Sequence, residues 1–359
     1  MLNQLRYINV YGPYSEMSTT QETIIKNHIN EINPEKFKNY LKAIKANILE
    51  NFELEEPIGS GSESIVYKGI SKKYRQFFAL KMILKENQKG NQNNNKNELK
   101  ILLKLKNKNK NIIQYYSTIK INDEIDCIIM EYSPLGNLRI FSKIIIPKKT
   151  LSETMLSYFS YQILNGLKYC HSCKVAHLDI KPENLVVDIN LNIKLIDFSI
   201  SLDYSKIKSN KIKIPLRGTC FYIAPEILSE QNLNINDINK VDLYSLGVTL
   251  YYLAFGYYPF GLNYYDNYKS LCQKVFNADL IINNEEKYFS YYFVDFLKKI
   301  LEKDITKRIN INQALNHYWI KGADILFDEN EKLYNDPSFL IKLNLNSFKE
   351  FNDYLGKGK

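Results

Sequence analysis

The fold is decided by residues 177–187, HLDIKPENLVV, and by the triplet DFS at residues 197–199. The apolar runs LVV at 185–187 and IKLI at 193–196 predict two short strands around a turn. A hairpin would bring the chain before its first strand close to the chain after its second strand. The polar groups at these two places would then meet at one rim. They are Asp179, Lys181, Asn184 and Asp197.

This set of an acid, a cation and an amide is typical of phosphoryl transfer, which needs neutralised charge and an oriented hydroxyl rather than covalent help. Asp179 would accept the proton of the attacking hydroxyl, and Lys181 would bind the transferring phosphate. Asn184 and Asp197 offer the hard oxygen ligands that Mg²⁺ prefers. The alternative interpretation is an acidic surface loop on an unrelated fold.

The two motifs resemble the catalytic loop H-R-D-x-K-x-x-N and the metal motif D-F-G of the eukaryotic protein kinases, in the same order and at similar spacing. The resemblance implies ATP and Mg²⁺ as cofactors. It also implies that Asp179, Lys181 and Asn184 form the catalytic set and that Asn184 and Asp197 are the metal ligands.

A glycine turn between two predicted strands precedes these motifs, within residues 52–70. Gly59 and Gly61 would let the backbone approach a phosphate closely, so that amide groups could bind the anion. The turn resembles the kinase motif G-x-G-x-x-G-x-V, with Ser64 in place of the third glycine. By this resemblance Val66 lies against the adenine of ATP.

The segment FALK at residues 78–81 resembles the kinase V-A-I-K strand, which implies that Ala79 covers the adenine and Lys81 neutralises the α and β phosphates. A buried lysine needs a charged partner. Glu98 follows 17 residues later (98 minus 81) at the start of an amphipathic run, which suits a return from strand to helix. The resemblance adds further nucleotide-site residues, which are Met130 as gatekeeper, Glu131 and Tyr132 at the hinge, and Val186.

Downstream, GTCFYIAPE at residues 218–226 resembles the kinase segment that seats a protein substrate. By this resemblance Thr219 bonds Asp179 and Lys181, which favours a Ser or Thr acceptor over Tyr. The resemblance further implies that Asp242 braces the catalytic loop. It pairs Arg308 with the glutamate of the APE triplet, Glu226. By the same resemblance Glu183 matches an acid that arginine-selecting kinases use to bind an arginine near the acceptor, whereas Asn137 and Tyr252 stand where further such acids would be.

The resemblance covers about residues 52–321 and implies an α+β, bilobal protein-kinase-like fold. We expect a small antiparallel-sheet lobe with one main helix at 52–132 and a larger, mainly helical lobe at 137–321. Residues 1–51 form an extension with a predicted helix, since apolar residues recur at helical spacing between 37 and 52. Residues 322–359 form a tail. The extension or the tail could bind a regulatory partner.

Composition restricts the class of protein further. The chain has 359 residues, 45% of them hydrophobic, and 48 Lys and Arg against 39 Asp and Glu give a net charge of +9. The excess is spread along the chain, which predicts no nucleic-acid partner. No apolar run reaches the roughly 20 residues of a membrane helix and no secretory signal is evident. With five scattered cysteines, these features favour a cytoplasmic location, with the nucleus as an alternative.

Three departures from the kinase pattern keep other functions in view. Leu178 stands where the family has an arginine that grips an activating phosphate, Ser199 replaces the glycine of D-F-G, and Ser64 replaces the third loop glycine. These departures favour the alternative that the chain is a pseudokinase, acting as a nucleotide-binding scaffold or signalling adaptor. A small-molecule kinase on a related fold is a third alternative. Within the family, YCHSCKVAHLDIKPENLVVD is most similar to the calcium/calmodulin-dependent and AMP-activated-like group.

Overall fold

The computed structural model describes residues 50–60, 64–84, 92–106, 108–121, 125–145, 151, 153–263, 265–282 and 289–321. The described residues fall into two compact units. The N-terminal unit holds those up to residue 108 together with 113–133, and the C-terminal unit holds 109–112 and 134–321. The predicted N-terminal helix, Gly61 and the tail at 322–359 lie outside the described residues.

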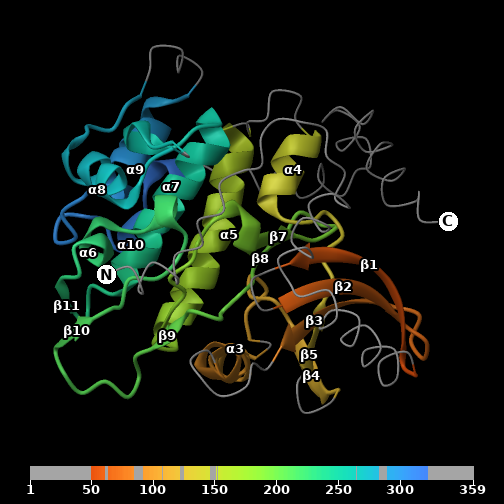
Figure 1. Ribbon diagram of the computed structural model, residues 1–359. Helices are drawn as coiled ribbons and strands as arrows, with labels where there is room; N and C mark the ends of the chain where they lie inside the picture. The colour runs from red at the N-terminus through yellow and green to blue at the C-terminus, as the bar shows by residue number, and fades with distance from the viewer. Residues whose placement is uncertain are drawn as a thin grey trace. The chain divides into compact units, whose positions relative to one another are not determined.

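The N-terminal unit contains a five-stranded antiparallel sheet with the strand order β1-β2-β3-β5-β4 (Figure 1). Its described elements are β1 (Phe52–Ser60), β2 (Ser64–Ser71), β3 (Phe77–Leu84), α3 (Gln92–Leu105), β4 (Tyr115–Lys120) and β5 (Ile125–Glu131). The predicted α+β class, with an antiparallel sheet beside one main helix, is confirmed.

Alternation along the strands separates the two faces of this sheet. The register sets Val66 opposite Lys81 and Ala79 opposite Met130, so these four side chains share one face. The residues between them point to the other face and contribute to a buried apolar cluster. This cluster consists of Phe52, Ile65, Tyr67, Leu80, Met82, Ile121, Ile125, Cys127 and Ile129.

The C-terminal unit is mainly helical, as predicted. Its helices are α4 (Leu138–Ile145), α5 (Glu153–Ser172), α6 (Pro225–Leu228), α7 (Asn239–Phe255), α8 (Tyr268–Asn277), α9 (Tyr291–Ile300) and α10 (Ile311–Leu315), with 3₁₀ turns η2 (Pro182–Asn184), η3 (Cys220–Tyr222) and η4 (Pro259–Gly261). Its short strands pair antiparallel as β6 (Val175–Ala176) with β9 (Leu202–Asp203), β7 (Leu185–Val187) with β8 (Ile193–Leu195), and β10 (Lys211–Lys213) with β11 (Asn232–Asn234). Helices α5 and α7 lie side by side and are largely buried (Figure 1).

Local sequence signals explain where several of these helices begin and end. The Ser290 side chain accepts a hydrogen bond from the backbone of Phe293 at the start of α9. Asn310 and Gln313 form a reciprocal capping box at the start of α10. Helix α7 ends at Gly256, whose φ of 79° a glycine adopts without steric cost.

The predicted hairpin forms between β7 and β8, with Leu185 opposite Leu195. A buried amide network fixes it to α5. The Gln162 side chain accepts a hydrogen bond from the Ile193 backbone at 2.8 Å, and its own amide donates to the Leu191 carbonyl at 3.0 Å. The Asn111 amide donates to both Gln162 and the Ile193 carbonyl. Paired buried amides of this kind hold the hairpin in one position.

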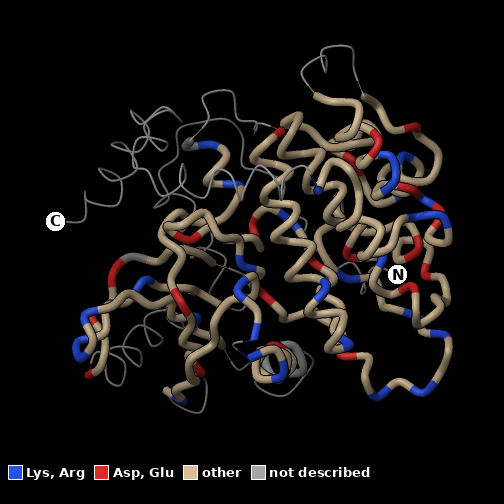
Figure 2. Tube along the Cα trace, turned by 180° about the vertical axis from the view of Figure 1, so that it is seen from behind, with Lys and Arg blue, Asp and Glu red and all other residues tan. Residues whose placement is uncertain are grey.

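Lys and Arg, in blue, and Asp and Glu, in red, are both distributed over the described chain (Figure 2). Among the described helices, none combines the length and the apolar character needed to cross a membrane. All five cysteines are free, and two of them, Cys127 and Cys170, are buried. Noncovalent packing therefore stabilises the described chain.

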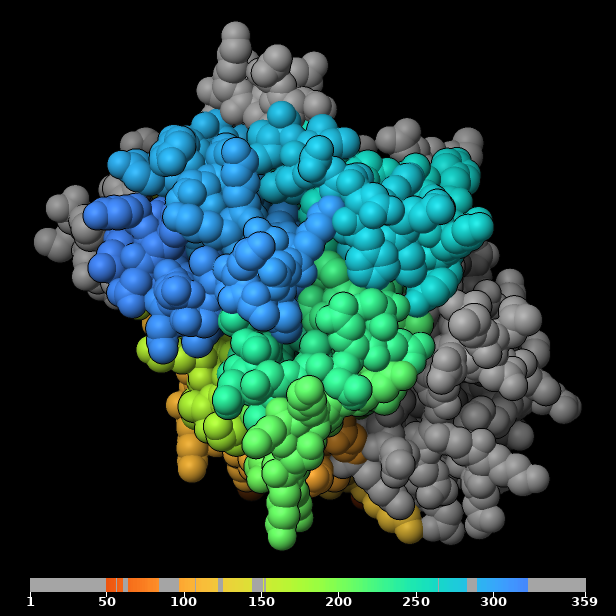
Figure 3. All heavy atoms as spheres, turned by 90° about the vertical axis from the view of Figure 1, so that its left-hand side faces the viewer, coloured from red at the N-terminus to blue at the C-terminus, as the bar shows by residue number. Residues whose placement is uncertain are grey.

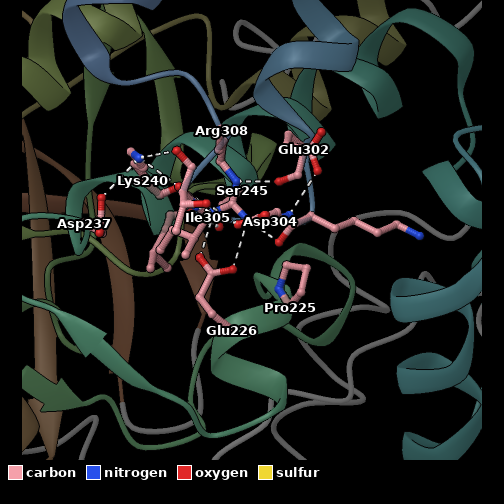
Figure 4. Close-up of polar contacts among 12 residues, drawn as sticks. Pro225, Glu226, Asp237, Lys240, Ser245, Glu302, Asp304, Ile305 and Arg308 are labelled. Atoms are coloured by element: carbon pink, nitrogen blue, oxygen red, sulfur yellow. Dashed lines mark hydrogen bonds and ion pairs between the residues drawn. The ribbon is translucent and has the colours of Figure 1, made fainter.

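One buried ion pair joins distant parts of the C-terminal unit (Figure 4). The guanidinium of Arg308 binds both carboxylate oxygens of Glu226, at 2.7 and 2.9 Å. Its remaining N–H groups donate to the carbonyl oxygens of Glu302, Lys240 and Lys303. All five donors of this buried side chain are thus satisfied. The expected pairing of Arg308 with Glu226 is present, and it connects α6 to the segment before α10.

We predict that Arg308→Met destabilises the protein by about 3–5 kcal/mol, because it leaves the Glu226 carboxylate buried without its partner. Urea unfolding, followed by tryptophan fluorescence and circular dichroism, measures this loss. Lys299→Met is the matched control, since Lys299 and Asp295 form an exposed pair that contributes about 0.5 kcal/mol or less. Equal losses in the two variants would contradict the assignment.

Candidate active site

One buried carboxylate, Asp242 in the first turn of α7, holds the backbone of the 177–187 loop. Its Oδ1 accepts a hydrogen bond from the Leu178 N–H at 2.7 Å, and its Oδ2 accepts one from the His177 N–H at 2.9 Å. Oδ2 also lies 2.8 Å from Nε2 of His171 on α5. Burial raises the pKa of Asp242, but the hydrogen bond and the charge of His171 outweigh burial and bring this pKa below its ordinary value. Asp242 thus makes the backbone contacts expected of a residue that braces the catalytic loop, and His171 provides a third contact.

Two residues of the site have left-handed backbone conformations, Leu178 with φ 67° and Asp197 with φ 62°. Such conformations cost about 1–3 kcal/mol in non-glycine residues, so the surroundings must hold them. The bond to Asp242 does so for Leu178. Gly218 has φ 108°, and a Cβ there would lie 3.0 Å from the Leu178 carbonyl oxygen. The close approach of these two backbones therefore requires glycine at 218.

Asp179 is the centre of a hydrogen-bond network. Its Oδ1 accepts bonds from the backbone N–H and the hydroxyl of Thr219, at 3.1 and 2.8 Å. Its Oδ2 lies 2.8 Å from both Nδ2 of Asn184 and Nζ of Lys181. Nζ of Lys181 also donates to the Thr219 hydroxyl at 2.6 Å. The expected contacts of Thr219 with Asp179 and Lys181 are present, and the four side chains form one closed set.

Lys181 remains a cation in this set. Burial lowers the pKa of its ammonium group, but the Asp179 carboxylate, assisted by Glu183 and Asp197, outweighs burial and raises the pKa of Lys181 above its ordinary value. A protonated amine beside the Asp179 carboxylate can neutralise charge on a phosphate brought to the rim.

The residues predicted to bind the metal occupy adjoining backbone. The Ile196 N–H donates to the Asn184 carbonyl oxygen at 3.0 Å, which sets Asn184 beside the chain that enters Asp197. Because Nδ2 of Asn184 donates to the carbonyl and the carboxylate of Asp179, its Oδ1 is the atom that could serve as a ligand. One carboxylate and one amide oxygen suit Mg²⁺, which is usually bound together with substrate phosphates and water.

Clusters of three or more His, Cys, Asp or Glu side chains that could hold a metal by themselves are absent from the described residues. The two oxygen donors that Asn184 and Asp197 would offer suit an ion that arrives with a phosphorylated ligand.

In the N-terminal unit, Nζ of Lys81 on β3 lies 2.7 and 2.8 Å from the two carboxylate oxygens of Glu98 on α3. Both residues are buried, with 8% of Lys81 and 1% of Glu98 exposed. The expected ion pair is present and holds the ammonium group on the same sheet face as Val66 and Ala79. Lys81 is thus a positioned cation beside an apolar surface.

The other predicted nucleotide residues, apart from Gly61, are also described by the structure. Gly59 on β1 pairs with Val66, and Met130 and Glu131 end β5. The Glu131 N–H donates to the Gln114 carbonyl oxygen at 3.0 Å. The Tyr132 ring lies 5.8 Å from the Phe77 ring. In the C-terminal unit Val186, on β7, forms an isolated bridge with Asn137.

Several residues that support the site were not predicted from the sequence. His171 contacts Asp242, and Gln162 with Asn111 fixes the β7–β8 hairpin. Gln162 and Asn111 lie outside the recognised motifs, and each partner of these three side chains is at least 29 residues away in the chain. Their one sequence signal is a polar residue within an otherwise apolar helical face, as at Gln162 and His171.

The segment after the metal motif is held by apolar contacts. Leu178 and Ile214 line one small cavity, together with Ile223, Ile227 and Arg217. Ile214 is 1% exposed. Strand β10 directly precedes Ile214 in the chain. The largely exposed stretch 205–210, which precedes β10, projects from the C-terminal unit (Figure 3). The position that holds an arginine in the kinase pattern is therefore a leucine that lines a mainly apolar cavity beside Arg217.

An antiparallel sheet carrying a buried Lys–Glu pair in one unit, and a braced acid–lysine–threonine–asparagine set in a helical second unit, together define a protein kinase domain. A family model described as "Protein kinase domain" matches residues 52–320. The chain belongs to the protein kinase family.

Curated relatives agree with this assignment. The chain is 31% identical to CBL-interacting protein kinase 11 of Oryza sativa subsp. japonica, over 76% of this chain and 52% of that protein. It is 30% identical to CBL-interacting serine/threonine-protein kinase 12 of Arabidopsis thaliana, over 77% and 54%. Identity to myosin light chain kinase A of Dictyostelium discoideum is 32%, over 76% and 88%. The chain spans about half the length of the two plant relatives. These relatives are in line with the predicted Ser/Thr type.

We predict that Asp242→Asn destabilises the protein by about 3–5 kcal/mol at neutral pH, because an amide cannot replace the charge and all three contacts. The folded-state pKa of Asp242 is lowered from 3.8, so its contribution is present above that pH and is lost as the pH falls through the folded value. Urea unfolding of both proteins from pH 7 downward should show a constant difference that narrows below about pH 4. Asp237→Asn, in a half-buried pair with Lys240, is the control. A difference that widens in acid would contradict this.

We predict that phosphatase treatment leaves most of the kinase activity intact, because Leu178, which lines an apolar cavity together with Ile214, cannot bind a phosphate. Radiolabelled transfer before and after treatment measures this. Leu178→Arg should lower activity, since it adds a second cation beside Arg217 in an apolar site. Loss of activity after phosphatase treatment, restored by rephosphorylation, would show that the prediction is wrong.

Proposed function

We propose that the chain is an ATP- and Mg²⁺-dependent protein kinase that transfers the γ-phosphate to Ser or Thr hydroxyls of proteins. The observation that carries the proposal is the closed set of Asp179, Lys181, Thr219 and Asn184, held by Asp242 on a strained backbone. Such a set has little use in a merely structural loop, because it concentrates buried charge that costs free energy unless it serves chemistry.

In this proposal Asp179 orients the acceptor hydroxyl and takes its proton. Each of its carboxylate oxygens is already bonded by donors that fix its direction, namely Thr219 at Oδ1 and Asn184 with Lys181 at Oδ2. The carboxylate therefore needs no reorganisation when the hydroxyl arrives, which is the condition for electrostatic catalysis. Lys181 supplies positive charge to the transferring phosphoryl group.

The nucleotide is the second part of the proposal. Lys81 would neutralise the α and β phosphates, held in place by Glu98 at 2.7 Å. Gly59, Gly61, Val66, Ala79, Met130, Glu131, Tyr132 and Val186 would contact the nucleotide. Asn184 and Asp197 would hold Mg²⁺, which when bound neutralises charge on the phosphates. We propose these roles on the resemblance of the motifs and on the fit of the donor set.

The Ser/Thr acceptor is supported by two observations. Thr219 and Lys181 are bonded to each other and to Asp179, an arrangement that the resemblance assigns to Ser/Thr kinases. One of the relatives carries serine/threonine-protein kinase in its name. We further propose residues 52–321 as the kinase domain, a cytoplasmic location, and the segments 1–51 or 322–359 as the place where a regulatory partner binds.

A second candidate function is a nucleotide-binding scaffold without transfer activity. Leu178, Ser199 and Ser64 favour it, because each departs from the pattern of active kinases. The complete set of acid, cations and metal ligands favours transfer. An assay of phosphate transfer to a generic protein substrate separates the two functions.

We predict that Asp179→Asn and Lys81→Met each lower the rate of phosphate transfer by at least about 10²–10³, because each removes a charge that the transition state requires. Radiolabelled ATP with Mg²⁺ and a Ser/Thr peptide library provides the measurement. Thermal unfolding of each variant shows that the fold is retained.

Asp203→Asn and Lys100→Met are matched controls, because Asp203 lies in β9 outside the site and Lys100 is exposed on α3, two residues beyond Glu98. Both should retain transfer activity. Full activity in Asp179→Asn would disprove its role. A wild-type chain that binds nucleotide yet transfers no phosphate would favour the scaffold.

A further inference from the structure

A row of stacked side chains crosses the C-terminal unit beside Asp179. The Phe221 ring stacks on Tyr258 with a centroid distance of 4.7 Å, and Tyr258 stacks on Tyr252 at 5.0 Å. The Arg139 guanidinium lies 5.3 Å from the Tyr252 centroid and ends the row. Phe221 follows Thr219 by two residues. The row therefore begins at the segment that contacts the catalytic carboxylate.

The far end of the row returns to the catalytic loop through an ion pair. Nη1 of Arg139 lies 2.9 Å from Oε1 of Glu183, and 16% of the Arg139 side chain is exposed. Glu183 directly precedes Asn184 and follows Lys181 by two residues. The pair thus lies beside the place where an acceptor peptide must bind if Asp179 is to reach its hydroxyl.

The pair changes what Glu183 can recognise. In kinases that select arginine near the acceptor, the acid matching Glu183 binds that arginine. Here Arg139 occupies Oε1, and Oε2 is buried with no hydrogen-bond partner among the described residues. An arginine of a substrate would have to compete with the Arg139 cation for Oε1, because Oε2 is buried. Like charges that are brought together disfavour binding.

Other groups around Arg139 strengthen its hold on this position. Burial lowers the pKa of the Arg139 guanidinium, but the Glu183 carboxylate and the neighbouring Tyr252 and Tyr222 outweigh burial and raise it. The face of Tyr252 adds a cation–π contact. The guanidinium is thus held by two partners. A substrate arginine that displaced it would only replace one charge pair with Glu183 by another.

We propose that Arg139 is a specificity-determining residue that closes the arginine subsite at Glu183 from within the chain, so that the substrates are proteins whose Ser or Thr acceptor is not selected by a neighbouring arginine. The inference rests on the proposed kinase function. In this proposal Arg139 binds Glu183 in place of an arginine of the substrate peptide, and this sets the class of substrate.

The test compares kcat/KM for peptides that differ at one position. A Ser/Thr acceptor peptide carries Arg, Ala or Glu at each position on either side of the acceptor in turn. The ratio of Arg to Ala and the ratio of Glu to Ala are measured for the wild type, Arg139→Met, Glu183→Gln and the double variant. Because each result is a ratio within one protein, a general loss of activity cancels. Methionine keeps the apolar contact with Tyr252.

For the wild type we expect the ratio of Arg to Ala to stay within about twofold at every position. Arg139→Met should raise it at least about fivefold at one or more positions, since it frees a carboxylate. Glu183→Gln frees the Arg139 cation instead and should raise the ratio of Glu to Ala at the same positions. The double variant should return both ratios toward the wild type.

Three results would overturn the inference. Selection of arginine by the wild type would show that the subsite is open. Unchanged ratios in both single variants would show that the pair does not face the peptide. If Arg139→Met does not fold, the ratio of Glu to Ala in Glu183→Gln decides the test, and an unchanged ratio overturns the inference. Transfer to no peptide by a folded, nucleotide-binding wild type would defeat the proposed function itself, and the inference with it.

Discussion

The active-site geometry depends on a single buried carboxylate. Asp242 brings together helix α5, helix α7 and the catalytic loop, because its two oxygens contact His171 and two consecutive backbone N–H groups. Those N–H groups belong to the turn in which Leu178 adopts a left-handed conformation. A carboxylate has two acceptor oxygens and a negative charge, whereas the neutral amide of the same size has one acceptor oxygen. The charge of Asp242 therefore holds the strained turn in place, and the turn in turn fixes the orientation of Asp179.

Much of this arrangement could be predicted from the sequence, for a physical reason. The loop, the metal motif and the hairpin are local, so the order of residues within about twenty positions sets their geometry. The Lys81–Glu98 pair is equally predictable, because a lysine on a buried strand needs a counter-charge and the next helix offers one. Contacts fixed by backbone register, such as Val66 opposite Lys81, follow once the strands are recognised.

The parts that could not be predicted are side-chain contacts between distant segments. Gln162 and Asn111 are ordinary polar residues in the sequence, yet their amides satisfy the backbone of the β7–β8 hairpin. The neighbouring sequence does not indicate which groups these amides bind, because an amide can pair with any donor or acceptor. The same holds for Arg139, which the sequence shows as one cation near the start of a helix and which the fold brings to Glu183.

Two positions at which the resemblance implies an external charge, Leu178 and Glu183, have a common physical meaning once the contacts are known. At Leu178 an apolar side chain lines the same small cavity as Ile214, where the family arginine would meet a phosphate. At Arg139 a cation of the chain meets Glu183, to which the resemblance assigns an arginine of the substrate. Under the two proposals neither position takes up an external charge, because leucine replaces the arginine at 178 and a residue of the chain binds Glu183. A fixed partner costs no entropy of association, and it would remove the dependence on that external charge. Under these proposals the active site is preformed without either external charge.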